Sequence, residues 1–209
     1  ASLINYNVTR AAGENAGKYA ITASGAKVQG NYTVTYEPGT FTITKSKALT
    51  VTGAPYDKPY DGNTHGSAAT TNIPEGTTIS YSTDGGQTWS DKYPNIQAVD
   101  EITVTVKAEN PNYETVTDTY ILKVTYKAVT VKADNKTKVY GDTDPQLTAT
   151  VNGLIGQDTV DYNLSRVQGE DVGDYTITPA GAAIQGNYSV TYDTGTLTIT
   201  AAGTLTVTG

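Results

Sequence analysis

Hydrophobic and polar positions alternate along short stretches of the chain, and this alternation predicts β-strands. Residues 40–44 (TFTIT) and 102–106 (ITVTV) place apolar side chains on one face and threonines on the other, as a half-buried strand requires. The alternation recurs at 121–124 and 129–131, and turn residues such as Glu37-Pro38-Gly39 follow or precede such runs. No segment carries an apolar stripe at helical spacing. We therefore expect several short antiparallel strands in each folded unit, and little helix.

The chain repeats itself, and the repeats define its organisation. Residues 5–44 align without a gap with residues 161–200, and more than half of the aligned positions are identical. A weaker similarity relates 47–52 (KALTVT) to 127–132 (KAVTVK). The predicted boundaries are the C-terminal half of one repeat at 1–46, full repeats at 47–126 and 127–203, and the first strand of a truncated repeat at 204–209.

One motif narrows the fold of each repeat. Gly17 and Tyr19 in the first part, and Gly173 and Tyr175 in the last, have the layout of the tyrosine corner of immunoglobulin domains. The glycine allows a sharp turn into a strand, and the tyrosine hydroxyl bonds back to the corner backbone. Together with a repeat length of about 75–80 residues, this predicts an all-β chain of tandem immunoglobulin-like β-sandwich repeats. With almost no linkers the repeats would form an elongated rod; β-grasp-like repeats are the alternative.

The half repeat at 1–46 lacks its first strands, so it should expose unpaired strand edges. We expect it to borrow a strand, to be only partly ordered, or to self-associate with another copy. The other expected partners are the neighbouring repeats of the same chain.

Composition and charge exclude several classes of function. The chain contains 16 Tyr but no Cys or Met, so it has no disulfide, thiol nucleophile or thiolate metal site, which suits an extracellular protein. Its formal net charge of -7 disfavours nucleic acid and anionic membrane surfaces as partners. No apolar stretch approaches the roughly 18 residues of a membrane span.

An Asp-box pattern, S-x-D-x-G-x-T-W, occupies residues 82–89 and is shared with sialidases. Its simpler interpretation is a hairpin turn in which Asp84 bonds the turn backbone and Trp89 packs beneath it. A sialidase needs three arginines to grip its substrate, whereas this chain has only Arg10 and Arg166, at equivalent positions of two repeats. Because His65 is the only histidine, no repeated catalytic triad can form either. We therefore expect no enzymatic activity.

Two weak binding candidates remain. Asp142 and Asp144 offer hard oxygen ligands to calcium, although Asp before Pro usually marks a turn. No other metal and no cofactor are expected. Trp89, Tyr81 and Tyr93 are candidate glycan contacts, because exposed aromatic rings stack on sugars; alternatively, tyrosine simply fills a thin core.

The repeated motifs resemble a known family. The series KAVTVKADNKTKVYGDTDPQL, GEDVGDYTI and NYSVTYDTGTLTIT is similar to the YGX-type MBG repeats of bacterial surface proteins and adhesins. The series KALTVTGAPYDKPYDGNTHG, ISYSTDGGQTWSD and VKAENPNYE resembles the YDG-bearing repeats that alternate with them.

The resemblance implies an extracellular location at the bacterial cell surface, on a parent that is attached to the cell wall or secreted. It brings no catalytic residues. The expected function is a stalk or spacer that holds a distal binding domain of an adhesin. The alternative is a module that itself binds host or microbial glycans, or mucin.

Overall fold

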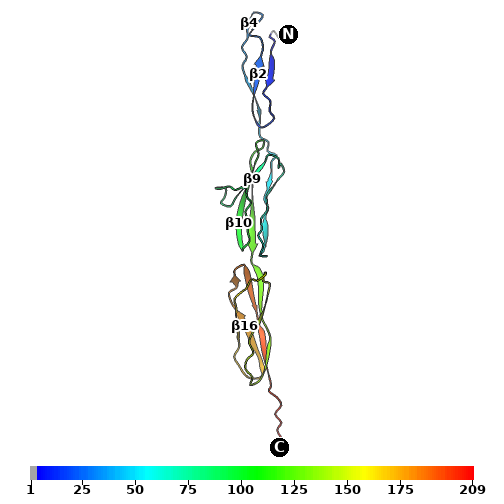
Figure 1. Cartoon of the computed structure of the whole chain (residues 1–209), viewed down its shortest axis with the longest axis vertical. Coiled ribbons are helices and arrows are strands. Elements are labelled where there is room, and N and C mark those ends of the chain that lie inside the picture. The colour runs from blue at the N-terminus through cyan, green and yellow to red at the C-terminus, as the bar shows by residue number, and fades with distance from the viewer. Residues whose placement is uncertain (1–3) are drawn as a thin grey trace. The chain divides into compact units, whose positions relative to one another are not determined.

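The computed structural model describes residues 4–209, and all regular structure in this range is β (Figure 1). Residues 1–3, which belong to the expected half repeat, lie outside the described residues. The prediction of an all-β chain is confirmed. Between residues 4 and 209 there is no helix that is long and apolar enough to cross a membrane.

The strands fall into the segments that the repeats define. Those before residue 46 are β1 (Asn7–Arg10), β2 (Gly17–Ser24), β3 (Val28–Gln29), β4 (Tyr32–Thr33) and β5 (Gly39–Ile43). Those of the middle repeat are β6 (Val51–Thr52), β7 (Tyr56–Pro59), β8 (Thr70–Thr71), β9 (Thr78–Ser82), β10 (Asp100–Glu109) and β11 (Val116–Thr125). Those of the last repeat are β12 (Lys127–Ala133), β13 (Lys136–Val139), β14 (Ala149–Asn152), β15 (Asn163–Arg166), β16 (Gly173–Ala180), β17 (Ile184–Gln185), β18 (Tyr188–Asp193) and β19 (Gly195–Thr200).

The repeat at 127–203, in which Figure 1 labels β16, is a sandwich of two four-stranded sheets. One sheet has the order β14-β12-β18-β17 and the other β13-β19-β16-β15. Within them β12 pairs with β18, and β13 with β19, in parallel, whereas the remaining pairs are antiparallel. The two sheets contact each other through β12 and β18 of the first and β16 and β19 of the second. This is the immunoglobulin-like sandwich that the sequence predicts.

Alternation along these strands builds the core of the last repeat. Every second residue of β12, β16 and β19 is buried or partly buried, and the residues between them are more exposed than the buried ones. The buried side chains form two clusters: Val129, Val131, Tyr188 and Val190 of the first sheet, and Ile177, Leu197 and Ile199 of the second sheet together with Ala133 of β12.

The middle repeat has a four-stranded sheet with the order β7-β11-β10-β9 and a short β6-β8 pair. Alternate residues of β10 and β11 are buried, again as a half-buried strand requires. The core side chains of this repeat are Leu49, Ala69, Tyr81, Ile96, Val104, Val106, Ala108, Tyr120, Leu122 and Val124.

The half repeat keeps the strand register of the last repeat but not its core. The pairs β1–β2 and β2–β5 match β15–β16 and β16–β19 residue for residue. The counterparts of β12, β13 and β14 are missing, so β4 pairs only with β3, and β5 only with β2. None of the residues 4–46 is buried. The edges that the sequence analysis expects to be open are thus unpaired in the described chain, and self-association through them stays a prediction.

The described chain divides into two compact units. The first contains the chain up to Pro55 together with Ser67–Pro94 and Thr103–Tyr120. The second contains Tyr56–Gly66, Asn95–Ile102 and Ile121–Gly209. The middle repeat contributes to both units because its long strands β10 and β11 each run through the division.

Inside each unit, an Asn-Tyr turn of one repeat bonds the corner of another. In the first unit the Ala16 N–H donates to Asn112 Oδ1 (2.8 Å), and Asn112 Nδ2 donates to Asn15 Oδ1 (2.9 Å). In the second unit the Val99 N–H donates to Asn187 Oδ1 (2.9 Å). Ala16 and Val99 occupy equivalent positions, immediately before the corner strand. The bond from this N–H to an asparagine Oδ1 is therefore made twice, and we refer to it as the asparagine clasp.

The missing strands predict a large difference between two equivalent side chains. Leu197 is fully buried (0 % exposed), whereas its counterpart Phe41 is 43 % exposed. Leu197→Ala should lower the free energy of unfolding of the last repeat by about 2–5 kcal/mol, because it leaves a cavity in the core. Phe41→Ala should cost about 1 kcal/mol or less for the half repeat.

Urea unfolding followed by NMR signals of each repeat measures both values. Equal losses in the two variants would show that the half repeat has a core of its own, contrary to the structure.

Candidate functional site

The Asp-box hairpin lies between β9 and β10 and is organised by one carboxylate. Asp84 Oδ1 accepts hydrogen bonds from the Ser82 hydroxyl (2.6 Å) and from the N–H groups of Gln87 (2.9 Å) and Thr88 (3.0 Å). Its Oδ2 accepts from the Thr88 hydroxyl (2.6 Å). These donors hold the pKa of Asp84 well below its usual range, the Ser82 hydroxyl most of all. Every bond of this carboxylate serves the turn, so its role here is structural.

Trp89 closes the same hairpin. Its Nε1 donates to the Gly86 carbonyl (3.0 Å), and its ring lies 3.4 Å from where a Cβ on Gly86 would stand. Lys107 Nζ lies 4.6 Å from the centroid of the ring, a cation–π contact that covers one face. The ring is half-exposed beside a cavity of about 290 Å³.

The two tyrosines of the candidate glycan site differ in burial. Tyr81 is buried, and its hydroxyl accepts a hydrogen bond from the Ala69 N–H (2.9 Å). Tyr93 is exposed, and its ring meets that of Tyr81 edge-on, with an interplanar angle of 76°. Of these three rings only Trp89 and Tyr93 are exposed, so the three do not form one flat platform, and glycan binding by them stays a prediction.

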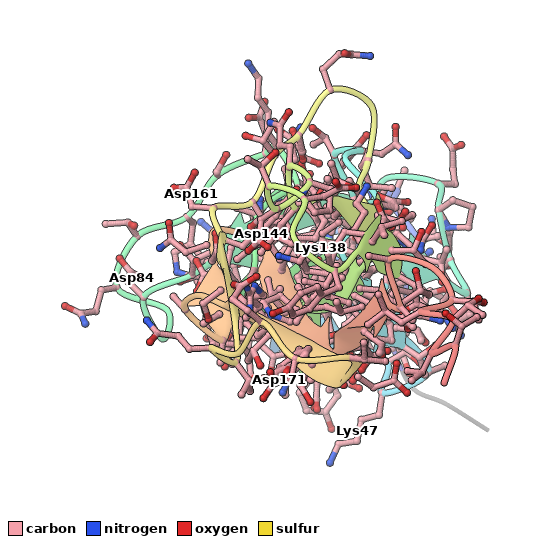
Figure 2. All side chains as sticks on the ribbon, turned by 90° about the horizontal axis from the view of Figure 1, so that it is seen from below. Lys47, Asp84, Lys138, Asp144, Asp161 and Asp171 are labelled. Atoms are coloured by element: carbon pink, nitrogen blue, oxygen red, sulfur yellow. The ribbon has the colours of Figure 1, made fainter. Side chains whose placement is uncertain are left out.

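A second polar cluster lies in the last repeat, where Lys138 and Asp144 lie together (Figure 2). Lys138 is buried, and its Nζ donates to Asp144 Oδ1 (2.8 Å) and to Glu170. Arg166 donates from Nε to Asp144 Oδ2 (2.6 Å) and from Nη2 to Glu170 Oε1 (2.6 Å). Two cations thus alternate with two carboxylates, in a network that ties β13 to β15 and to the corner before β16.

The network favours the charged form of every member. Hydrogen bonds from Arg166, and next from Lys138, lower the pKa of Asp144 to about 2. Lys138 and Arg166 likewise lower the pKa of Glu170, and the carboxylates raise the pKa of both cations. The side chains are therefore ion pairs at neutral pH.

The geometry of the calcium candidates follows from this network. Both oxygens of Asp144 already accept hydrogen bonds from cationic side chains, and the Asp142 backbone carbonyl accepts from Lys138 Nζ (3.2 Å). Within residues 4–209 no group of three or more His, Cys, Asp or Glu side chains is arranged to hold a metal ion. Calcium binding stays a prediction, and a calcium ion there would have to displace Lys138 and Arg166.

His65, the only histidine of the chain, lies in a small cluster of its own. Its ring stacks on Tyr56, with 4.0 Å between the ring centroids and an interplanar angle of 13°. Its Nε2 lies 2.8 Å from Asp61 Oδ1, and this hydrogen bond is the largest cause that lowers the pKa of Asp61 to about 2. The cluster joins the ends of one loop.

The tyrosine corners have the same bonds in both segments where the motif occurs. Tyr19 Oη donates to the Asn15 carbonyl (2.7 Å), and Tyr175 Oη donates to the Asp171 carbonyl (2.9 Å). The guanidinium of Arg166 lies over the Tyr175 ring, 5.6 Å from its centroid, as Arg10 lies over Tyr19. The two arginines of the chain are thus parts of the corner.

The glycines that the corner depends on most, Gly13 and Gly169, were not predicted from the sequence. At Gly13 and Gly169 φ is +141° and +154°, and a Cβ there would lie 2.2 Å and 2.1 Å from the corner tyrosine ring. At Gly173 φ is +156° with open space around it, and Gly17 has no positive φ. The signal was available, because R-x-x-G-E is identical in both segments.

The ion-pair network predicts an acid-sensitive repeat. Because the folded-state pKa of Asp144 lies below its unfolded value near 3.8, the ionised network stabilises the fold above about pH 4. That stabilisation should be lost as the pH falls from about 4 towards 2. Asp144→Asn should flatten the pH dependence of the unfolding midpoint of this repeat.

The matched control is Asp161→Asn, an exposed carboxylate of the same repeat with no side-chain hydrogen bond in the described structure (Figure 2). Thermal unfolding between pH 2 and pH 6 compares the variants. A pH profile of Asp144→Asn that matches the parent would contradict the role of the network.

Solved structures with a similar arrangement are tandem immunoglobulin-type proteins. Sidekick-1 immunoglobulin domains 1–5 share 15% identity, over 89% of this chain and 46% of theirs, at a TM-score of 0.35. Titin domains I67–I69 share 12%, over 95% and 83%, at 0.34, and the insect immune protein hemolin shares 12%, over 88% and 56%, at 0.35. The chain thus spans less than half of the Sidekick-1 structure. At these identities and scores, we draw no argument from the similarity.

Comparison with protein families is specific. None of the curated proteins matches this sequence. The model of the MBG domain (YGX type) matches residues 1–42 and 129–198, which is more than half of the chain. The two matched segments are the half repeat and the last repeat, with their shared strand register and tyrosine corners. The chain therefore belongs to the MBG domain family, YGX type.

Proposed function

We propose that this chain is a non-catalytic spacer of a bacterial surface adhesin-like protein, which holds a binding domain away from the cell wall. The observation that carries the proposal is the asparagine clasp, made by Asn112 and again by Asn187. A contact that recurs at equivalent positions is a property of the repeat array. The partners of each repeat are therefore the neighbouring repeats of the same chain.

Direct strand-to-strand joining supports the same function. β11 ends at Thr125 and β12 begins at Lys127, so a single residue separates the two strands. Repeats that are joined in this way have little linker length in which to move independently.

The polar clusters of the chain also fit a spacer. Asp84 bonds its own hairpin, and Lys138 and Arg166 bond the carboxylates beside them. In each case the chemistry is used to hold backbone segments in place. The absence of cysteine and methionine from the sequence suits an exposed extracellular protein.

A direct glycan-binding module is the second candidate, and one observation favours it. Trp89 and Tyr93 are both exposed, and Trp89 lines a cavity of about 290 Å³. Against it, Lys107 covers one face of Trp89 and Tyr81 is buried. We therefore place this function second.

If the chain is a spacer, each added repeat should increase its length by a similar amount. The chain should be compared with a version lengthened by residues 54–209 after Gly209, which continues the 156-residue period of the sequence. Small-angle X-ray scattering should show a longer maximum dimension with an unchanged cross-sectional radius. A Gly-Ser linker of the same length is the control, because a flexible coil grows only with the square root of its length. An unchanged maximum dimension would contradict a spacer.

The two candidate functions also differ on a glycan array that includes mucin. For a spacer we expect no specific binding by the intact chain. Binding that is lost in Trp89→Ala and kept in Tyr126→Ala, a control at another exposed aromatic residue, would establish the adhesive function instead.

A further inference from the structure

The last repeat carries an exposed patch at its tyrosine-corner end. Tyr140 is 51 % exposed and Val172 is 59 % exposed. Both line a cavity of about 520 Å³, together with Asp171 and residues 201–205. The Val172 N–H has no hydrogen-bond partner among residues 4–209. An apolar pair next to a free backbone donor and a carboxylate is an unusual surface to leave open to solvent.

The middle repeat shows what covers this surface. Its equivalents of Tyr140 and Val172 are Tyr60 and Val99, and both are partly buried. The Val99 N–H donates to Asn187 Oδ1 (2.9 Å). The Tyr60 ring packs edge-on against the ring of Tyr188, with 5.6 Å between centroids and an angle of 88°. One Asn-Tyr turn therefore covers both features at once.

In the half repeat an Asn-Tyr turn also bonds the residue that is equivalent to Asp171. The Ala16 N–H donates to Asn112 Oδ1, and Asn112 Nδ2 donates to Asn15 Oδ1 (2.9 Å). Asn15 is the equivalent of Asp171. In both segments the residue before the backbone donor (Ala16 or Val172) therefore carries a side-chain oxygen that can accept a hydrogen bond. At Asp171 the acceptor is a carboxylate, which makes a stronger hydrogen bond with an amide N–H than a neutral oxygen does.

We propose that the patch formed by Tyr140, Asp171 and Val172 is a docking surface for the Asn-Tyr turn of another MBG repeat. The asparagine Oδ1 accepts from the Val172 N–H, and its Nδ2 donates to the Asp171 carboxylate. The tyrosine that follows packs edge-on against Tyr140. The proposal goes beyond the spacer function, because the same docking would order an adhesive array.

Chemistry selects this occupant over a free peptide ligand. Asparagine supplies an acceptor and a donor on one planar group, which matches a backbone N–H beside an acceptor oxygen. The turn also has to be presented by a folded repeat, because the contact uses one side chain and one ring from a fixed backbone. Covalent connection adds an effective concentration in the millimolar range, which strengthens a contact made by one hydrogen bond and one ring pair.

Amide hydrogen exchange measured by NMR on the full chain provides the reference. The amides of Ala16 and Val99 should exchange slowly, and that of Val172 quickly. Asn187→Ala should accelerate exchange of the Val99 amide about tenfold, in line with the loss of one hydrogen bond worth about 1.4 kcal/mol. If Val99 exchange does not change in this variant, the clasp does not form in solution and the proposal fails.

The docking itself is tested by appending residues 54–126 after Gly209, which continues the 156-residue period and supplies a second Asn112-Tyr113 turn. We expect the Val172 amide to exchange about tenfold more slowly, and the Tyr140 ring signals to shift. Asn112→Ala in the appended copy should restore fast exchange at Val172. Asn95→Ala in the appended copy, at an exposed asparagine, should not.

Fast exchange at Val172 next to a folded appended repeat would overturn the proposal, as would protection that survives Asn112→Ala. These outcomes are separate from those of the scattering experiment. A lengthened chain can act as a spacer even where the Val172 amide stays free.

Discussion

The fold of the last repeat depends on two parallel strand pairs that join its beginning to its end. β12 pairs with β18, and β13 with β19, across about sixty residues of chain. Without these pairs neither sheet can cover the other. Strands β1, β2 and β5 of the half repeat pair in the same register as β15, β16 and β19 of the last repeat, yet none of residues 4–46 is buried. The apolar side chains that would form a core are present there; the strands that would enclose them are not.

Much of this could be predicted from the sequence, because it depends on local patterns and on repetition. Alternation fixes which face of β10 or β19 is buried, and the 156-residue period identifies equivalent positions. The sandwich could be favoured over other β folds through the tyrosine corner. Parallel pairing could not be predicted from such patterns, because it joins segments far apart in the chain and leaves no local signal. The repeated R-x-x-G-E marks Gly169 as important, but its role could not be assigned from the sequence, because it depends on where the Tyr175 ring lies in space.

The candidate chemistry behaves differently from what isolated motifs suggest. Asp84 and Asp144 are carboxylates with strongly lowered pKa, a feature that often marks functional sites. Here each lowered pKa has a structural cause, since the donors come from the same hairpin or from cations that link neighbouring strands. Arg166 shows the point most clearly. Its guanidinium binds Asp144, Glu170 and the Gly169 carbonyl, and lies over Tyr175, so no donor direction is left aimed at a ligand.

In an array of small sandwiches, the polar groups at the two ends of each domain need hydrogen-bond partners. The corner that begins β16 leaves a backbone N–H outside the sheet, and the Asn-Tyr turn before β18 places an amide side chain at the opposite end of the same repeat. Each group is unsatisfied in an isolated repeat and complementary to the other in a neighbour. The energy of one such contact is small, about that of a single hydrogen bond. The contact is directional, because the asparagine Oδ1 must meet a backbone N–H and, at Asn112, the Nδ2 must also meet an acceptor oxygen. Repeats that carry both groups are therefore complementary to one another. A corner whose N–H lacks this contact, such as that of Val172, is complementary to the Asn-Tyr turn of another MBG repeat.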